Sequence, residues 1–200
     1  MIYALHSKLL IKINIIIFDL EITMRNNYLI KNSILLILPA QDFNEQEYLI
    51  ISNSLIKANK KLFIASDSNS LCVGSENLKV KNDILLYNVH EENFNGIIFI
   101  GGKGIRKYWD NKLLHLIAQK FDKSKKIIGA ICSAPVILAK AGIIKKVATC
   151  FPDDRKELEK EGIEYKDEPV VIDSNVITGR DPASAPEFIS RFLYELSKKS

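Results

Sequence analysis

Short runs of apolar residues alternate with amphipathic stretches along most of the chain. The run SILLILPA at 33–40 is almost continuously apolar, which is typical of a strand buried on both faces of a parallel sheet. The next stretch, 44–60, instead places its apolar residues at helical spacing. A strand followed by a helix in this way favours an α/β fold.

The same alternation continues to the end of the chain. Further strands are expected at 61–66, 96–102, 126–131 and 147–151, with hairpins at 71–86 and 169–179. Further helices are expected at 110–123, 133–143, 153–162 and 185–199, the third of them capped by an aspartate. We predict a doubly wound α/β sandwich with a mostly parallel sheet and a small β-hairpin excursion at 71–86. Sites in such sheets lie beyond the carboxyl ends of the strands.

The first 31 residues depart from this regular pattern. Their apolar segment, 9–18, is interrupted by Lys12 and is too short to span a bilayer. No small-residue cleavage site follows it, so it is a poor signal peptide. Two interpretations stay open: an extra element of the domain, or a translated leader before a true start at Met24. We predict an N-terminal extension at 1–31 and one domain at 32–200.

Composition narrows the class of protein. A chain of 200 residues with 47% hydrophobic and 26% charged residues has the size and mixture of one globular domain. The net charge of +4 comes from dispersed lysines without interleaved aromatic residues, which argues against a nucleic-acid partner. Three cysteines and three histidines match no zinc motif, so no metal and no disulfide framework is expected. A reducing cytoplasm fits this cysteine usage best.

A candidate nucleophile stands where the strand at 126–131 ends. Cys132 follows this strand directly, and a helix is expected from Ser133 onwards. A nucleophile on such a sharp turn needs small residues two positions before and after it, and Ala130 and Ala134 meet that demand. We expect the positive end of the helix to lower the pKa of the thiol below ~8.5 and give a thiolate. The alternative is an inert buried cysteine.

Two further strand ends carry candidate groups. Glu47 follows the first strand, and a carboxyl held beside a thiol is expected to have a raised pKa and to exchange protons. Asn44 and Glu47 also have capping-box spacing, so a purely structural role for Glu47 stays open. Gly101 and Gly102 follow another strand, and their N–H groups with that of Ser133 are candidates for an oxyanion hole.

The strand ending in Gly-Gly, AICSAP, DFNEQEYLI and the ending ITGRDPASAPEF resemble the ThiJ/PfpI superfamily over about residues 33–198. The resemblance implies a flavodoxin-like sandwich, usually homodimeric, with Cys132 as the reactive cysteine and Glu47 as its carboxyl neighbour. It also implies that GRDPASAPEF packs near the site and starts the last helix. The activity it implies is that of a glyoxalase or deglycase that needs no cofactor.

The chain departs from the family pattern at two positions. PfpI-type members place a histidine after the cysteine, where this chain has Ser133, and other members carry a histidine where Cys150 stands. No histidine follows His115, so no Cys-His pair carries over, and a cysteine peptidase or a glutamine amidotransferase is disfavoured. Cys150 is either a resolving thiol for oxidised Cys132 or a cysteine of the core.

Two functions remain. In the first, Cys132 adds to a small reactive carbonyl such as methylglyoxal and Glu47 moves a proton. In the second, Cys132 reacts with peroxide, Glu47 stabilises its sulfinate, and the protein is a redox sensor or stress-response chaperone without turnover. The expected partners are a small carbonyl or a peroxide and a second copy of the chain, with no membrane. Arg106, Tyr108 and Trp109 either line the pocket or pack on its rim.

Overall fold

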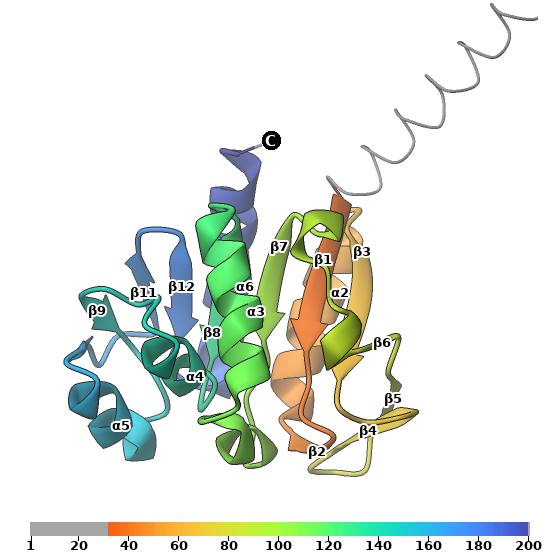
Figure 1. The fold of residues 1–200 in the computed structure, drawn as a ribbon, viewed down its shortest axis with the longest axis horizontal. Helices are drawn as coiled ribbons and strands as arrows, with labels where there is room; N and C mark the ends of the chain where they lie inside the picture. The colour runs from red at the N-terminus through yellow and green to blue at the C-terminus, as the bar shows by residue number, and fades with distance from the viewer. Residues whose placement is uncertain (1–31, 200) are drawn as a thin grey trace, which may run out of the picture.

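The computed structural model describes residues 32–199, and a seven-stranded sheet forms their centre (Figure 1). The strand order is β11-β12-β8-β7-β1-β3-β6. Neighbouring strands pair in parallel except β11 and β12, which form the hairpin expected at 169–179. The strands are β1 (Ser33–Ile37), β3 (Lys61–Ser66), β6 (Ile84–Leu85), β7 (Gly96–Phe99), β8 (Ile127–Ile131), β11 (Val170–Asp173) and β12 (Val176–Gly179).

Helices cover both faces of this sheet, as a doubly wound fold requires (Figure 1). One face carries α2 (Glu45–Lys57) and α6 (Ala185–Ser197), with Phe188 and Phe192 of α6 in its core. The other face carries α3 (Lys112–Lys123) and α4 (Pro135–Lys140), with Phe121 and Ile137 in a second core. The predicted fold class is confirmed.

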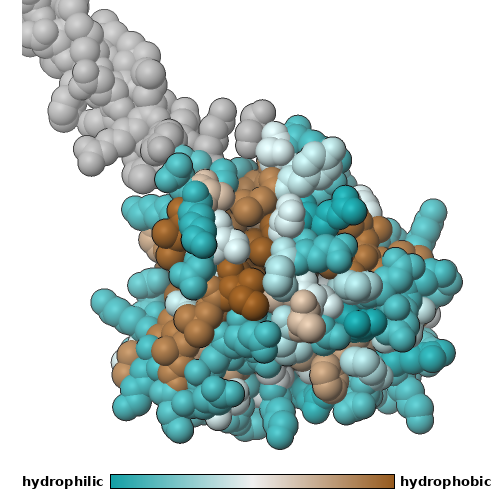
Figure 2. Space-filling view, turned by 180° about the vertical axis from the view of Figure 1, so that it is seen from behind, coloured by the Kyte–Doolittle hydropathy of each residue, from teal (hydrophilic) through white to brown (hydrophobic). Residues whose placement is uncertain are grey.

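The face with α2 and α6 leaves apolar side chains at the surface, and Figure 2 shows this side of the molecule. Leu49 and Ile56 of α2 are 44% and 58% exposed, and Tyr194 of α6 is 55% exposed. Exposed apolar side chains gathered on one face favour contact with another protein.

The predicted hairpin excursion is present but shorter than expected. β4 (Leu71–Gly74) and β5 (Lys79–Lys81) pair antiparallel, and β2 (Gln41–Phe43) joins them in a three-stranded sheet. The carboxylate of Glu45 accepts the N–H groups of Glu76 and Leu78, which ties this excursion to α2. The end of the predicted hairpin belongs to β6 of the central sheet, so that part of the prediction is wrong.

The region after α4 also differs from the sequence expectation. The strand expected at 147–151 shortens to β9 (Val147–Ala148), which pairs with β10 (Glu164–Tyr165) outside the central sheet. The helix expected at 153–162 divides into a 3-10 turn, η4 (Pro152–Asp154), and α5 (Arg155–Lys160). Asp154 does not cap α5, because its carboxylate binds Arg106 instead. The other 3-10 turns are η1 (Leu86–Asn88), η2 (Glu91–Asn93), η3 (Gly104–Tyr108) and η5 (Pro182–Ser184).

The extension at 1–31 lies outside the described residues, so its two interpretations stay predictions. Among residues 32–199, no helix has both the length and the apolar character that crossing a membrane requires.

Candidate active site

Cys132 lies at the end of β8 in a backbone conformation that is uncommon for a residue with a side chain. Its φ is +61°, in the left-handed region. Its N–H donates to the carbonyl of Gly179 at 2.9 Å, and its carbonyl accepts the N–H of Phe151 at 2.8 Å. Ala130 and Ala134 on either side are fully buried. The sharp turn expected at this position is present, and these contacts hold it in place.

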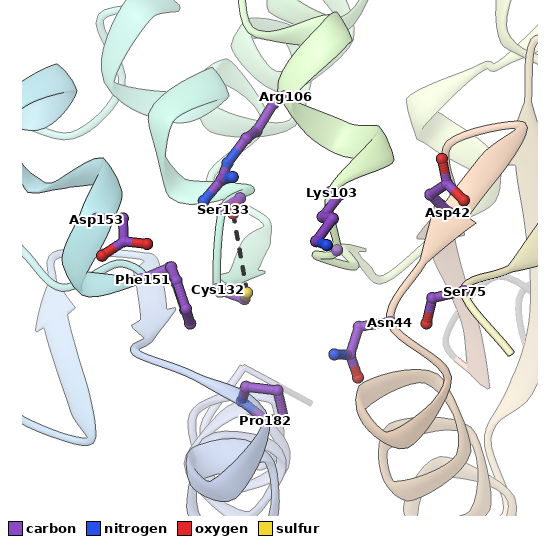
Figure 3. A pocket seen from close by; sticks show the side chains of 11 residues that line it. Asp42, Asn44, Ser75, Lys103, Arg106, Cys132, Ser133, Phe151, Asp153 and Pro182 are labelled. Carbon is purple, nitrogen blue, oxygen red and sulfur yellow. Dashed lines mark hydrogen bonds between the residues drawn. The ribbon is translucent and has the colours of Figure 1, made fainter.

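A pocket of about 510 Å³ opens over Cys132 at the carboxyl ends of the strands (Figure 3). The cysteine itself is 6% exposed, and its Sγ lies 3.9 Å from Oγ of Ser133. Pro182 in the wall comes from the segment GRDPASAPEF, which was expected to pack near the site. The lining residues are Asp42, Asn44, Ser75, Gly102, Lys103, Arg106, Cys132, Ser133, Phe151, Asp153 and Pro182.

Glu47 lies behind the sulfur and is completely buried. Asn44 caps α2, because its side-chain oxygen accepts the N–H of Glu47 at 3.0 Å. The carboxyl of Glu47 does not complete a capping box: its Oε2 accepts the N–H of Gly101 at 2.8 Å, while the N–H of Asn44 donates to the carbonyl of Gly101. The side chains of Glu47 and Cys132 are close enough for each to shift the pKa of the other. The carboxyl therefore faces the candidate nucleophile.

The environment of Glu47 keeps it protonated at neutral pH. Burial raises its pKa to about 8, against the lowering effect of the N–H of Gly101 and of the contact with Cys132. Its Oε1 is buried and has no hydrogen-bond partner within residues 32–199. The raised pKa expected from the sequence is confirmed, and this carboxyl can hold and release a proton beside the sulfur.

The thiol does not have the lowered pKa that the sequence suggested. Burial, and after it the charge of ionised Glu47, raises the pKa of Cys132 to about 12, although the N–H of Gly102 and the hydroxyl of Ser133 act in the opposite direction. Burial is the largest of these effects, so the N-terminus of α4, which begins at Pro135, does not bring the pKa below its usual value. Cys132 and Glu47 therefore titrate as a coupled pair.

The three N–H groups expected to form an oxyanion hole differ in their availability. That of Gly101 is occupied by Glu47. That of Gly102, a residue with φ +112°, faces the sulfur of Cys132. The N–H of Ser133 has no acceptor among the described residues, so it and Gly102 are the groups that can meet a negative oxygen next to the sulfur.

The residues after the glycine turn occupy three different places. Arg106 lines the pocket. Trp109 donates from Nε1 to the carbonyl of Ser133 at 2.8 Å and so supports the turn that follows the nucleophile. Tyr108 lies outside the pocket lining, where its hydroxyl donates to Asp67 at 2.7 Å.

Lys103 is a pocket residue that the sequence interpretation missed. The available signal was its position directly after the Gly-Gly turn that ends β7. Asp42 and Asn44 were missed as lining residues too, although they follow β1 at the same edge of the sheet.

Cys150 lies next to the site but outside the pocket lining. It is fully buried in the core on the α3 and α4 face, and its Sγ donates to the carbonyl of Phe151 at 3.3 Å. Its sulfur is close enough to Cys132 for a charge there to raise its pKa, after the larger effects of burial and Asp154. All three cysteines are free thiols. Whether Cys150 resolves an oxidised Cys132 stays a prediction.

Histidine does not contribute to this pocket. The lining residues include none, and His115 is buried elsewhere with its Nε2 2.7 Å from the carbonyl of Trp109. Within residues 32–199, no group of three or more His, Cys, Asp or Glu side chains is arranged to hold a metal ion.

Comparisons with known proteins agree with this fold. The profile of the DJ-1/PfpI family matches residues 32–195. An uncharacterised protein of Methanocaldococcus jannaschii is 34% identical over 173 residues, which are 84% of this chain and 83% of that protein. The glutathione-independent glyoxalase DJR-1.2 of Caenorhabditis elegans is 28% identical over 83% of this chain and 89% of its own. The crystal structure of a ThiJ/PfpI domain protein from Brachyspira murdochii has a TM-score of 0.82 at 26% identity, covering 84% of this chain and 98% of that one.

Proposed function

Because the chain belongs to the DJ-1/PfpI family, we propose that it is a cysteine-dependent enzyme that converts small α-oxoaldehydes such as methylglyoxal into hydroxy acids. The observation that carries the proposal is the pairing of Cys132, at the floor of a pocket, with a buried Glu47 whose pKa is about 8. A relative named as a glyoxalase supports the reaction type.

In the first step, the sulfur of Cys132 attacks the aldehyde carbon while its proton passes to one oxygen of protonated Glu47, and the proton on the other oxygen of Glu47 passes to the aldehyde oxygen. A bond forms between sulfur and carbon, and the electron pair of the C=O bond moves to its oxygen. The free N–H of Ser133, with that of Gly102, stabilises this oxygen until it takes a proton. The product of this step is a hemithioacetal.

In the second step, Glu47 takes the hydrogen of the former aldehyde carbon as a proton while its own proton passes to the neighbouring carbonyl oxygen, which gives an enediol. Glu47 then returns a proton to the neighbouring carbon and accepts the proton of the hydroxyl on the carbon that carries the sulfur. The hemithioacetal thereby becomes a thioester of a hydroxy acid. Water then adds to the thioester, the sulfur–carbon bond breaks and the Cys132 thiol regains its proton. Overall, one carbon is oxidised, its neighbour is reduced and one water is consumed, so the reaction needs no outside oxidant.

The test is lactate formation from methylglyoxal by the purified protein. We expect Cys132→Ser to lower kcat/KM by ~1000-fold or more, because a hydroxyl cannot replace the sulfur as nucleophile in this pocket. Cys150→Ser is the matched control, since it changes another buried cysteine that lies outside the pocket lining, and it should keep its activity. Wild-type turnover by Cys132→Ser would contradict the proposal.

A second candidate is a redox sensor or chaperone without turnover, and the pocket's lack of histidine favours it, as it also disfavours a peptidase. Two molecules of peroxide would each transfer one oxygen to the sulfur of Cys132, giving a sulfinic acid and two molecules of water, and protonated Glu47 would donate to the sulfinate. Intact mass after mild peroxide separates the cases. A gain of two oxygens on Cys132, without lactate formation, supports the sensor, whereas a loss of two hydrogens supports a disulfide with Cys150.

We further propose that the chain forms a homodimer through the face of α2 that exposes Leu49 and Ile56. Ile56→Glu should then give a monomer by light scattering. Tyr87→Glu is the control, because Tyr87 is a 69% exposed residue on η1, away from α2. A monomeric wild type would refute this part of the proposal. The free thiols fit the reducing cytoplasm that the sequence favours.

A further inference from the structure

Two cationic side chains line the pocket that contains the sulfur of Cys132. Figure 3 shows Arg106 extending from η3 toward Ser133, and Lys103 between Cys132 and Asn44. The reaction proposed above does not require either cation, because methylglyoxal is uncharged. Their presence therefore points to another part of the substrate.

Arg106 is held in a fixed orientation. Its Nη2 lies 2.9 Å from Oδ1 of Asp154 and its Nε donates to Oδ2 at 3.3 Å, so the two side chains form a fork. The Asp154 side chain is 5% exposed, and the guanidinium also lies over the ring of Phe151. Nη1 has no acceptor among residues 32–199. A guanidinium fixed in this way can donate to an anion with little further loss of freedom.

The backbone of Lys103 is fixed by the glycines on either side. A Cβ at Gly102 would lie 2.4 Å from the carbonyl oxygen of Asp42, and one at Gly104 would lie 1.7 Å from that of Gln41. The chain can therefore pack directly on β2, which places Lys103 at the pocket wall. Within residues 32–199, no carboxylate forms an ion pair with its ammonium group, so its charge is uncompensated.

The pocket also has two carboxylates and more space than a small dicarbonyl needs. Asp42 and Asp153 are exposed, and Figure 3 shows the carboxylate of Asp42 turned away from Cys132. Solvent and salt screen such exposed charges, that of the exposed Lys103 included, whereas the half-buried guanidinium of Arg106 is screened less. The volume of about 510 Å³ is typical of sites for much larger ligands. A chain attached to the dicarbonyl therefore has room to reach the cations.

We infer that the pocket selects α-oxoaldehydes that carry an anionic group, a carboxylate or a phosphate monoester, at the end away from the reacting aldehyde. Lys103 and Arg106 are the residues that bind this group, while Cys132 forms the bond to the aldehyde carbon. The inference rests on the proposed function for its turnover, but the preference for anions is a property of the pocket and can be measured without turnover.

The first experiment alkylates Cys132 with iodoacetate and with iodoacetamide, which differ in charge. In both reactions the sulfur gives up its proton to the solvent and forms a bond to carbon, and iodide leaves with its electron pair. Rates are followed by peptide mass spectrometry, because Cys72 and Cys150 are fully buried while Cys132 is partly accessible. We expect the rate ratio of iodoacetate to iodoacetamide to exceed that of a small free thiol and to fall with added salt. A ratio equal to that of the free thiol would overturn the inference.

Variants then assign this preference to residues. Lys103→Gln should lower the ratio by ~3-fold, as for a partly screened charge. The double variant Arg106→Gln with Asp154→Asn should lower it by ~10-fold, and it leaves no uncompensated buried carboxylate. Lys107→Gln is the matched control, since Lys107 is an exposed lysine of η3 outside the pocket lining. An equal effect of Lys107→Gln, in variants that melt like the wild type, would refute the assignment.

The second experiment measures turnover of 4,5-dioxopentanoate, of its uncharged methyl ester and of a phosphorylated α-oxoaldehyde. We expect kcat/KM to favour the acid over the ester by ~10-fold, mainly through KM, and Lys103→Gln to remove most of this difference. The carboxylated and phosphorylated substrates show which anion is preferred. Equal turnover of acid and ester would reject the inference and leave the proposed function standing. An iodoacetate preference without any turnover would support the inference and reject the proposed function.

Discussion

The carboxyl of Glu47 and the thiol of Cys132 meet across the backbone of Gly101. A methyl group at position 101 would lie 2.6 Å from Cβ of Cys132 and 2.7 Å from Oε2 of Glu47. Both distances are well inside van der Waals contact. The contact between acid and thiol therefore depends on a residue that has no side chain.

Gly101→Ala should separate the two groups. We expect kcat/KM for an α-oxoaldehyde to fall by ~100-fold and the free energy of unfolding to fall by ~1–3 kcal/mol, because the methyl group has no space. Gly142→Ala is the control: its φ is +70° and nothing lies within 4 Å of its Cβ, so it should cost only ~1 kcal/mol of strain and keep its activity. Full activity in Gly101→Ala would show that the close contact is dispensable.

Glu47 should make stability depend on pH. Burial raises its pKa from 4.5 to about 8, so the folded chain keeps a proton that the unfolded chain releases between these values. The resulting stabilisation is complete below about pH 4.5 and is lost as the pH rises through about 8, with a slope of up to ~1.4 kcal/mol per pH unit. Urea unfolding of wild type and Glu47→Gln across this range measures the slope as their difference. Parallel stability curves would contradict the buried, protonated carboxyl.

Glu47 should also restrain the thiol in alkaline solution. Above about pH 8 its carboxylate is ionised, and this negative charge raises the pKa of Cys132. Glu47→Gln removes the charge, so we expect iodoacetamide to alkylate Cys132 severalfold faster at about pH 9, while the proposed turnover falls. Glu187→Gln, an exposed carboxyl at the start of α6, is the control and should alkylate at the wild-type rate. A slower reaction of Glu47→Gln would mean that the carboxyl activates the sulfur directly.

Trp109 should act as a positioning residue for the turn after the nucleophile. Trp109→Phe removes the hydrogen bond to the carbonyl of Ser133, and we expect kcat to fall by ~10-fold with little change in KM and a loss of ~1 kcal/mol of stability. Tyr108→Phe removes two hydrogen bonds of η3, the one that the hydroxyl donates to Asp67 and the one that it accepts from the N–H of Ala40, and should affect stability without lowering kcat. If both variants lower kcat equally, the effect belongs to η3 as a whole.

The apolar runs of the sequence predict the buried strands well, because a strand covered by helices on both faces is apolar at every position. β1, β3, β7 and β8 all appear where such runs occur. The short β2 could not be predicted from its own residues, because its pairing depends on β4, which lies about thirty residues further along the chain. Likewise, β9 does not join the central sheet and pairs instead with β10, which lies further along the chain.

The site shows a similar division between local and long-range effects. The turn at Cys132 could be predicted from Ala130 and Ala134, since small neighbours are a local requirement. The direction of the shift in the pKa of Cys132 could not be predicted from the sequence, because it depends on burial by distant segments and on the charge of Glu47. The role of Gly101 could not be predicted either: its N–H was expected to face a substrate oxygen, but it donates to the carboxyl of Glu47.

The backbone of Cys132 is bonded on one side to Gly179 and on the other to Phe151, segments that the chain completes only after the cysteine has been made. A nascent or truncated chain that ends before β12 therefore lacks the acceptor for the N–H of Cys132, and we expect the turn at this residue to be less well held there. Labelling of Cys132 at the rate of the native protein would therefore measure the fraction of molecules in which β12 has folded. A chain that stops before β12 would contain the same sulfur but should not be labelled at that rate.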